Sequence, residues 1–263
     1  MFNATHFTYD GVYSGVYGLR IASFEDETTT ETPVFSPTFT TFKSSRAKRF
    51  IHGGIKYDEA PECPITFLSE GIISDTTRRD ILAWLTGRNE YKKLQIHQPD
   101  LDGYYYRCIF KDVQIIYVRG QCFGFSATAQ FDSIYAYGKS KTISITGAGE
   151  EVSAKVVVTS DVVDDYIYPI VEFSISGQTE GVSISITNED DIVQEAFVFE
   201  GIRENERVVV DNELKLIDSD VGGDRLSCFN KKWLKLRKGV NNLKIKINGT
   251  AKITVPVYVM IGF

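Results

Sequence analysis

The stretch Cys122-Phe-Gly-Phe-Ser-Ala-Thr-Ala-Gln-Phe131 decides the fold class of this chain. Apolar or small side chains occupy every second position, namely Phe123, Phe125, Ala127, Ala129 and Phe131. Because successive side chains of a β-strand point to opposite faces, this alternation predicts a strand with one buried face. Residues 113–118 precede it across Arg119-Gly120, and this arrangement predicts an antiparallel hairpin.

The composition fits a β-rich globular protein. Of the 263 residues, 43% are hydrophobic, 24% are charged and 13% are aromatic, so the chain can bury a core and favours strands. The net charge of -6 argues against a protein that coats nucleic acid, because phosphate binding needs a basic surface. The four cysteines form no Cys-x-x-Cys pair, so we expect no metal site and mostly buried free thiols. A cross-strand pair between Cys108 and Cys122 remains open.

One helix interrupts the strands. The run Ser74-Asp-Thr-Thr-Arg-Arg-Asp-Ile-Leu-Ala-Trp-Leu-Thr-Gly87 has a capping residue at its start and an apolar stripe at helical spacing. We expect Gly87 to end the helix in the left-handed conformation. Other strands of this half are expected near residues 17–21, 65–68, 91–97 and 104–110.

The sequence pattern of residues 25–50 predicts an extended arm. Pro33 and Pro37 disfavour regular ladder pairing in its first part, which is rich in Thr and Glu. Its second part is basic and flanked by two aromatic residues, and it supplies the candidate inter-subunit contacts Phe42, Lys43, Arg46, Lys48, Arg49 and Phe50. Their cationic surface suits an acidic neighbour such as another copy of this chain. A solvated loop is an equally good interpretation.

Beyond Gly138 the aromatic residues thin out, and short alternating runs follow one another. They predict an antiparallel β-sandwich, with strands near residues 143–146, 154–159, 170–176, 182–187, 196–200, 207–210, 213–217, 233–236, 243–247 and 251–259. Asn248-Gly249 is a strong hairpin signal between the last two runs. We therefore predict two domains, residues 1–138 and 139–263.

The sequence offers no catalytic constellation. The acidic clusters at 164–165, 189–191, 211–213 and 218–220 are best interpreted as solvated turns, and His6, His52 and His97 lie beside no nucleophile motif. We expect no enzyme activity and no cofactor. The N-terminus lacks the pattern of a signal peptide, and no apolar run reaches membrane-spanning length, so we expect no membrane insertion.

Trp233 carries the main alternative function. After Lys231-Lys232 it could stack against a sugar, which would make residues 139–263 a carbohydrate-binding, lectin-like adhesion module. A Trp that opens an alternating run is more often part of a core.

The order of these features resembles the distal tail proteins of long-tailed, non-contractile bacteriophages. The resemblance rests on the Tyr/Gly-rich start, the Pro/Thr arm, the single helix ending in Trp84-Leu85-Thr86-Gly87, and the strand Tyr104-Tyr105-Tyr106-Arg107. The most specific piece is Trp233-Leu-Lys-Leu-Arg-Lys-Gly-Val-Asn-Asn242, although Lys238 stands where the family often has Pro. The resemblance implies a mainly β chain, with an N-terminal tail-tube-like β-sandwich domain that carries one α-helix and a C-terminal galectin-like β-sandwich.

The family also implies a function. Its members are structural virion proteins that form a hexameric ring at the distal end of the tail tube, where the ring joins the tube to the tail tip or baseplate. The implied partners are five further copies, the major tail tube protein, a tail-associated hub or fibre protein and, in some phages, receptor-binding proteins. DNA passes through the channel without specific binding. Such a protein is assembled in the bacterial cytoplasm and ends in the virion.

Overall fold

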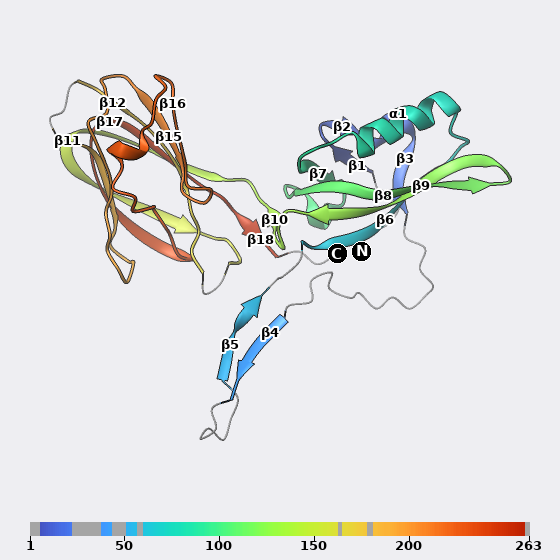
Figure 1. Cartoon of the computed structure of the whole chain (residues 1–263), viewed down its shortest axis with the longest axis horizontal. Coiled ribbons are helices and arrows are strands. Elements are labelled where there is room, and N and C mark those ends of the chain that lie inside the picture. Colours follow the sequence, from blue (N-terminus) through green and yellow to red (C-terminus); the bar gives the residue numbers. More distant parts are fainter. Residues whose placement is uncertain are drawn as a thin grey trace. The chain divides into compact units, whose positions relative to one another are not determined.

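The computed structural model describes residues 6–22, 38–43, 51–56, 60–162, 165–177 and 181–260. The chain divides into two compact units, Met1–Tyr137 with Met260–Phe263 and Gly138–Val259 (Figure 1). Antiparallel strands dominate both units, so the prediction of a mainly β chain is confirmed.

The first unit is built on one seven-stranded sheet with the order β2-β1-β7-β8-β9-β6-β3. Its strands are β1 (Phe7–Tyr9), β2 (Val12–Tyr13), β3 (Leu19–Ala22), β6 (Glu62–Ser69), β7 (Lys92–Ile96), β8 (Tyr106–Val118) and β9 (Gln121–Phe131). The 3-10 helices η1 (Ser14–Tyr17) and η2 (Pro99–Leu101) lie in connections, and the short strand β10 (Ala136–Tyr137) ends the unit. Aromatic rings fill the core, where Phe7 stacks on Trp84 at a centroid distance of 5.6 Å.

The predicted helix is confirmed as α1 (Asp75–Thr86), which packs Ile81, Trp84 and Leu85 into this core. Ser74 caps it, because its hydroxyl accepts a hydrogen bond from the Thr77 N–H. The prediction for Gly87 is wrong, since its φ of -78° is not left-handed. The glycine has a steric role instead: a Cβ there would lie 2.5 Å from the Ala83 carbonyl oxygen.

The hairpin of β8 and β9 turns at Arg119-Gly120 as predicted, with Val118 opposite Gln121. Two strands expected at 104–110 and 113–118 are one strand with an irregularity at Asp112, whose φ is 53°. The alternation from Phe125 to Phe131 is confirmed, but Phe123 is partly exposed. The register shifts there, because Ile116 faces Gly124 and Tyr117 faces Cys122, and the extra residue changes face.

Part of the predicted arm forms a hairpin. β4 (Thr38–Phe42) pairs with β5 (Ile51–Lys56) in a two-stranded sheet of its own. The expectation of an arm or loop without regular ladder pairing is therefore wrong for Thr38–Phe42, and both prolines precede the ladder. Residues 23–37 and 44–50 lie outside the described part of the chain.

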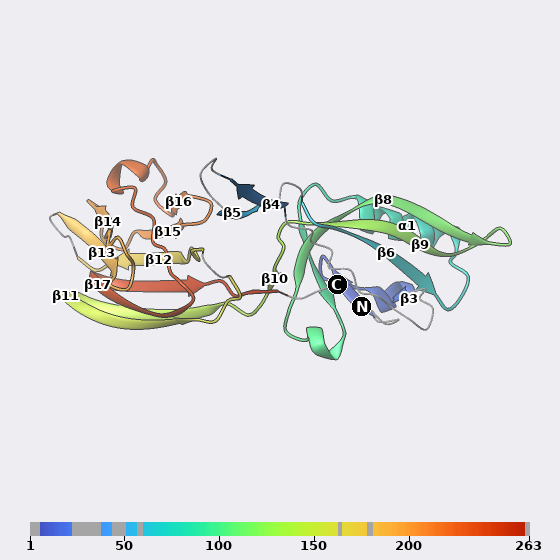
Figure 2. The same cartoon turned by 90° about the horizontal axis from the view of Figure 1, so that it is seen from below.

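The second unit is organised around β17 (Gly239–Val255), which pairs along its whole length with β11 (Lys141–Val158) (Figure 2). The other strands are β12 (Ile170–Ile175), β13 (Val182–Asn188), β14 (Phe197–Glu200), β15 (Arg207–Asp211) and β16 (Leu216–Ser219). The 3-10 helix η3 (Leu226–Cys228) and the short strand β18 (Tyr258–Val259) complete the unit. The run 233–236, expected as a strand, forms only an isolated bridge between Leu236 and Ile167.

The predicted hairpin at Asn248-Gly249 is wrong, because β17 continues through both residues. Its first half pairs with β13 and its second half with β12, so the strand passes from one sheet neighbour to another at this point. Gly249 has a φ of 145°, and a Cβ there would lie 2.1 Å from the Ser174 carbonyl oxygen. The dipeptide therefore allows a corner in a long strand where two backbones approach closely.

Candidate assembly surfaces

Two of the predicted contact residues, Phe42 and Lys43, are described by the structure, and both lie at the end of β4 in the β4–β5 hairpin. Phe42 is 57% exposed at the end of β4, and Lys43 follows it on the surface. Arg46, Lys48, Arg49 and Phe50 lie outside the described residues. The hairpin pairs with no other strand among the described residues, and a lone two-stranded hairpin is marginally stable in water.

A second apolar surface lies at the end of the β8–β9 hairpin. Tyr117 and Val118 are each 51% exposed, and Ile72 is 59% exposed. They are neighbours, because Tyr117 faces Cys122 in the ladder and the Cys122 carbonyl accepts a hydrogen bond from Ile73 N–H. Arg78 fixes the tyrosine by donating to its hydroxyl at 3.2 Å. The sequence analysis did not single out these residues.

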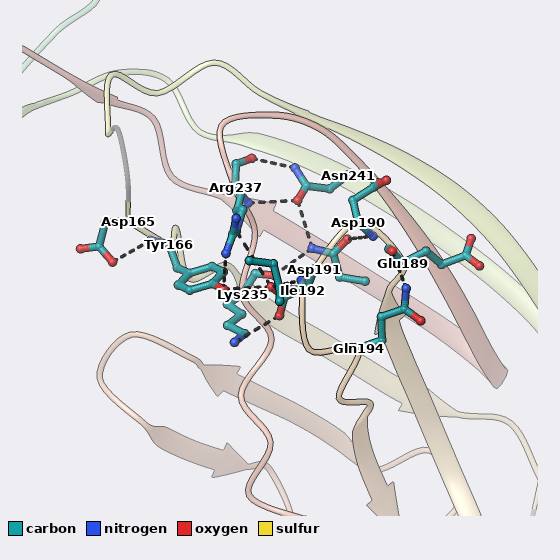
Figure 3. Close-up of polar contacts among 11 residues, drawn as sticks. Asp165, Tyr166, Glu189, Asp190, Asp191, Ile192, Gln194, Lys235, Arg237 and Asn241 are labelled. Carbon is teal, nitrogen blue, oxygen red and sulfur yellow. Dashed lines mark hydrogen bonds and ion pairs between the residues drawn. The ribbon is translucent and has the colours of Figure 1, made fainter.

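The second unit carries a buried charge cluster on three connections (Figure 3). Asp191, only 4% exposed in its side chain, accepts a hydrogen bond from the Tyr166 hydroxyl at 2.9 Å and pairs with Lys235 Nζ at 3.1 Å. Arg237 donates to the Tyr166 oxygen at 2.7 Å. The Lys235 Nζ and the Arg237 guanidinium also lie 4.4 and 4.8 Å from the Tyr166 ring centroid.

The electrostatics of this cluster favour an ionised Asp191. Burial alone raises the pKa of the carboxyl group, but hydrogen bonds from Tyr166 and Lys235 outweigh it, and the pKa lies below its ordinary value. Two cations thus face one buried anion, although the same connections also carry the carboxylates of Asp165, Glu189, Asp190 and Glu195. The cluster ties residues 165–167, 189–195 and 233–238 together at one end of the unit.

The loop between β13 and β14 is held in shape by this cluster. Asp191 accepts from the Ile192 N–H at 2.9 Å, Asp190 accepts from Asn242 N–H, and Gln194 donates to the Glu189 carbonyl at 2.8 Å. The loop nevertheless presents Ile192 and Val193 to solvent, with exposed fractions of 79% and 54%. We call these two residues the apolar tip.

A hollow of about 510 Å³ lies beside β14 in the same unit. Val198 and Phe229 supply apolar walls, Glu200 supplies a carboxylate, and Gly181, Gly201 and Cys228 complete much of the lining. Phe229 is held by a bridge to Phe199 and by ring stacking at 4.7 Å. These contacts fix the position of Phe229 in the wall of the hollow.

A second buried carboxylate, Glu206, is fully covered. Its oxygens accept hydrogen bonds from Arg225 at 2.5 and 3.2 Å and from Ser219 at 2.6 Å. Burial raises the pKa of Glu206, but these hydrogen bonds outweigh it and lower the pKa. The pair fixes the segment that follows β16.

The interpretation of the acidic clusters as solvated turns is wrong for Asp191, because only the fold brings Lys235 and Arg237 against it. It holds for Asp211, which accepts from the Glu213 and Leu214 N–H groups in an exposed turn. The sequence contains only a weak indication that Asp191 is buried, namely that two apolar residues, Ile192 and Val193, follow it directly. Asp164 lies outside the described residues.

The remaining candidates have structural partners. Trp233 is half-buried and packs edge-on against Phe229 at 4.8 Å, as a core residue does. His6 contacts Ser14, His97 contacts Thr8, and nothing is described of the His52 side chain. Cys108 and Cys122 are buried free thiols, so the open question of their pairing is answered against a disulfide.

The described residues hold no group of three or more His, Cys, Asp or Glu side chains placed to bind a metal ion. In the same part of the chain, no helix is long and apolar enough to cross a membrane.

Two family models match the chain. The phage tail protein N-terminal domain matches residues 2–133, and the phage tail C-terminal domain matches residues 135–257. The chain is a phage tail protein. It is therefore a component of the virion. No curated protein matches its sequence significantly.

Solved structures share the fold of this phage tail protein over nearly its whole length. The Dit protein of phage SPP1, described as a paradigm of the hub adsorption apparatus in phages that infect Gram-positive bacteria, matches with a TM-score of 0.69 at 15% identity. That match covers 97% of this chain and 99% of that one. A chain of the phage p2 baseplate, in its activated conformation with calcium, matches with a TM-score of 0.57 at 9% identity, covering 98% and 99%. The resemblance to distal tail proteins is thus confirmed for the fold.

Proposed function

We propose that this phage tail protein forms a hexameric ring at the distal end of the tail tube and joins the tube to the tail tip or baseplate. The observation that carries the proposal is the full-length fold likeness to the hub protein of SPP1, which includes both units. The ring contacts the major tail tube protein on one side and a tail-associated hub or fibre protein on the other. The second unit is the proposed attachment site for receptor-binding proteins where the phage has them. The role is structural and needs no catalytic group.

Exposed apolar residues of the first unit support self-association. A ring closes by a head-to-tail contact, which needs two different surfaces on each copy. Phe42 on the β4–β5 hairpin and the group Ile72, Tyr117 and Val118 are separate surfaces of this kind. The hairpin gains most from a neighbour, because it has no further strand partner among the described residues.

The charge of the chain supports passage of DNA without binding. The net charge is -6, and a conduit that does not hold phosphates lets the duplex slide. Assembly takes place in the cytoplasm of the bacterial host.

The particle mass of the purified chain tests the ring. Mass photometry should give a species six times the 29.6 kDa of one chain, and electron microscopy should show six-fold symmetry. Single copies at every concentration, together with absence of the chain from the tail tip of the virion, would refute the proposal.

The arm has its own test. Replacing Phe42 by Ser removes an apolar contact worth about 2 kcal/mol per interface, so the concentration for half-assembly should rise about 30-fold. Val240→Ser is the matched control, because Val240 is 47% exposed in the other unit. Deleting residues 28–46 should leave single copies, and an intact ring after this deletion would exclude the arm from the contact.

A further inference from the structure

The strand β14 lies at one edge of its sheet in the second unit, but a connecting segment covers that edge. In the strand order β14-β13-β17-β12-β15-β16, the neighbouring strand of β14 is β13. The free side of an edge strand presents N–H and C=O groups that can pair with a further strand. Here Asn230, which follows η3, lies against that side.

Asn230 occupies the outward-facing backbone groups of β14. Its backbone N–H donates to the Val198 carbonyl at 3.1 Å, and its side-chain Oδ1 accepts from the Val198 N–H at 3.2 Å. Its Nδ2 donates to the Ala196 carbonyl at 2.8 Å. In an antiparallel ladder, the N–H and C=O of Val198 would both bind one residue of a further strand. Asn230 therefore takes the place of that residue.

The same side chain turns the chain away from the edge. Asn230 Oδ1 also accepts from the Lys232 N–H at 3.1 Å, and Lys231 between them has a φ of 63°. An Asn side chain that binds the backbone two residues further on stabilises a turn. The segment accordingly contacts the β14 ladder through one isolated bridge, and Lys232 then pairs with Glu195 at 2.6 Å. The segment is thus a short cover rather than a further strand of the sheet.

The covered strand is well suited to pairing with another strand. Residues 196–199 read Ala-Phe-Val-Phe, which combines apolar side chains, high β propensity and no charge. Glu195 and Glu200 flank this run. An antiparallel pair of two such strands centred on Val198 would place each flanking glutamate opposite an uncharged residue, so like charges would not face each other.

We propose that Asn230 is an edge guard, which prevents β14 of one copy from pairing with β14 of a second copy. Without this side chain, the Val198 N–H and the Ala196 carbonyl lose their partners, and a strand of a second copy can complete the ladder. Pairing of this kind would join copies, or rings of copies, through the wrong surface. The inference does not rest on the proposed ring, because it concerns a contact that the folded chain avoids.

Replacing Asn230 by Ala in the full chain tests the edge guard. In mass photometry this variant should give particles of at least twice the wild-type particle mass, whether the wild type is a single copy or a ring. In hydrogen exchange, residues 196–200 of the variant should gain protection as the protein concentration rises, and those of the wild type should not. Ser227→Ala is the matched control, because Ser227 lies in the same connection and donates to the Asp224 carbonyl rather than to β14.

A second substitution separates strand pairing from loss of folding. Adding Val198→Pro to Asn230→Ala removes the N–H that a further strand would bind, and proline is tolerated at the free side of an edge strand. The double variant should return to the wild-type particle mass. Asn230→Asp keeps an oxygen that can accept from the Val198 N–H, and it should also stay at the wild-type mass.

Three results would overturn the edge guard. The first is a wild-type particle mass for Asn230→Ala. The second is a rise in mass that Val198→Pro does not reverse, because aggregation of unfolded chains does not need the Val198 N–H. The third is an equally large rise for Asn230→Asp or for Ser227→Ala, since neither variant removes the oxygen that occupies the edge.

Discussion

Replacing Gly249 by Ala tests the corner in β17. Gly249 has a φ of 145° and faces Gly147 of β11, and a Cβ there would lie 2.1 Å from the Ser174 carbonyl oxygen and 3.0 Å from the Ile175 Cα. Both contacts are with backbone atoms, which cannot rotate away as the end of a side chain can. The β12 strand must therefore move, or β17 must straighten.

Two costs add at this position. Holding a residue with a Cβ in a sparsely populated region of φ and ψ costs about 1–3 kcal/mol. Displacing packed neighbours costs about 1–3 kcal/mol more. We expect a loss of about 4 kcal/mol for the second unit, which lowers its melting temperature by roughly 15 °C.

Gly149→Ala separates the two costs. Gly149 also has a positive φ, 93°, but nothing lies within 4 Å of a Cβ placed there. This control should lose only the conformational part, about 1–2 kcal/mol. Calorimetry of the full chain measures both variants, and hydrogen exchange assigns the transition to peptides of the second unit. Equal losses of stability for the two variants would refute the close approach of the Gly249 and Ser174 backbones.

Three further substitutions test single contacts. Ser74→Ala should cost the first unit about 1 kcal/mol in denaturant unfolding, because it removes the cap on Thr77 N–H, and no loss would contradict the capping role. Asp191→Asn should cost about 2 kcal/mol at neutral pH. Because folding lowers the pKa of Asp191, this stabilisation exists above the unfolded value of about 3.9 and is lost as the pH falls through the folded value, so the two stability curves should converge in acid. Arg225→Met should cost about 3–5 kcal/mol by leaving Glu206 buried without its cation, and a smaller loss than Ser74→Ala causes would contradict that pairing.

Local patterns were sufficient to predict much of the fold. The helix bounds followed from Ser74 and the apolar stripe, and the β8–β9 hairpin followed from alternation on both sides of Arg119-Gly120. These features depend on neighbours in sequence. Phe123 was misplaced because a bulge shifts the face of a strand by one residue, and the partner strand determines where the bulge falls.

Asn248-Gly249 failed as a hairpin signal for a non-local reason. The dipeptide does supply a positive φ, but the surrounding ladder with β11 runs on through Gly147 and Ala148. The two long strands bend together, and a partner about a hundred residues away cannot be read from the turn itself.

The candidate contact surfaces could be predicted only in part from the sequence. Phe42 and Lys43 are exposed, as a contact role requires. The surface of Ile72, Tyr117 and Val118 and the apolar tip were not predicted, because they depend on which apolar residues the fold leaves exposed. A strand-rich sequence contains many apolar positions, and only the register of the strands decides that Val118 is exposed whereas Phe125 is buried. Surface patches are therefore predicted less well than the strands that carry them.

The two buried carboxylates indicate what the second unit gains from charge. An ion pair in a covered site contributes little net stability over an apolar pair, since both groups lose their hydration. Asp191 and Glu206 nevertheless each join segments distant in sequence, at residues 166, 191 and 235 and at residues 206, 219 and 225. Both fix the shape of connections rather than the core. In the proposed ring every contact is repeated by rotation, so an error in the shape of one loop would recur at each interface. The two buried carboxylates therefore set the shape of connecting loops, which is the property that the proposed repeated assembly would require.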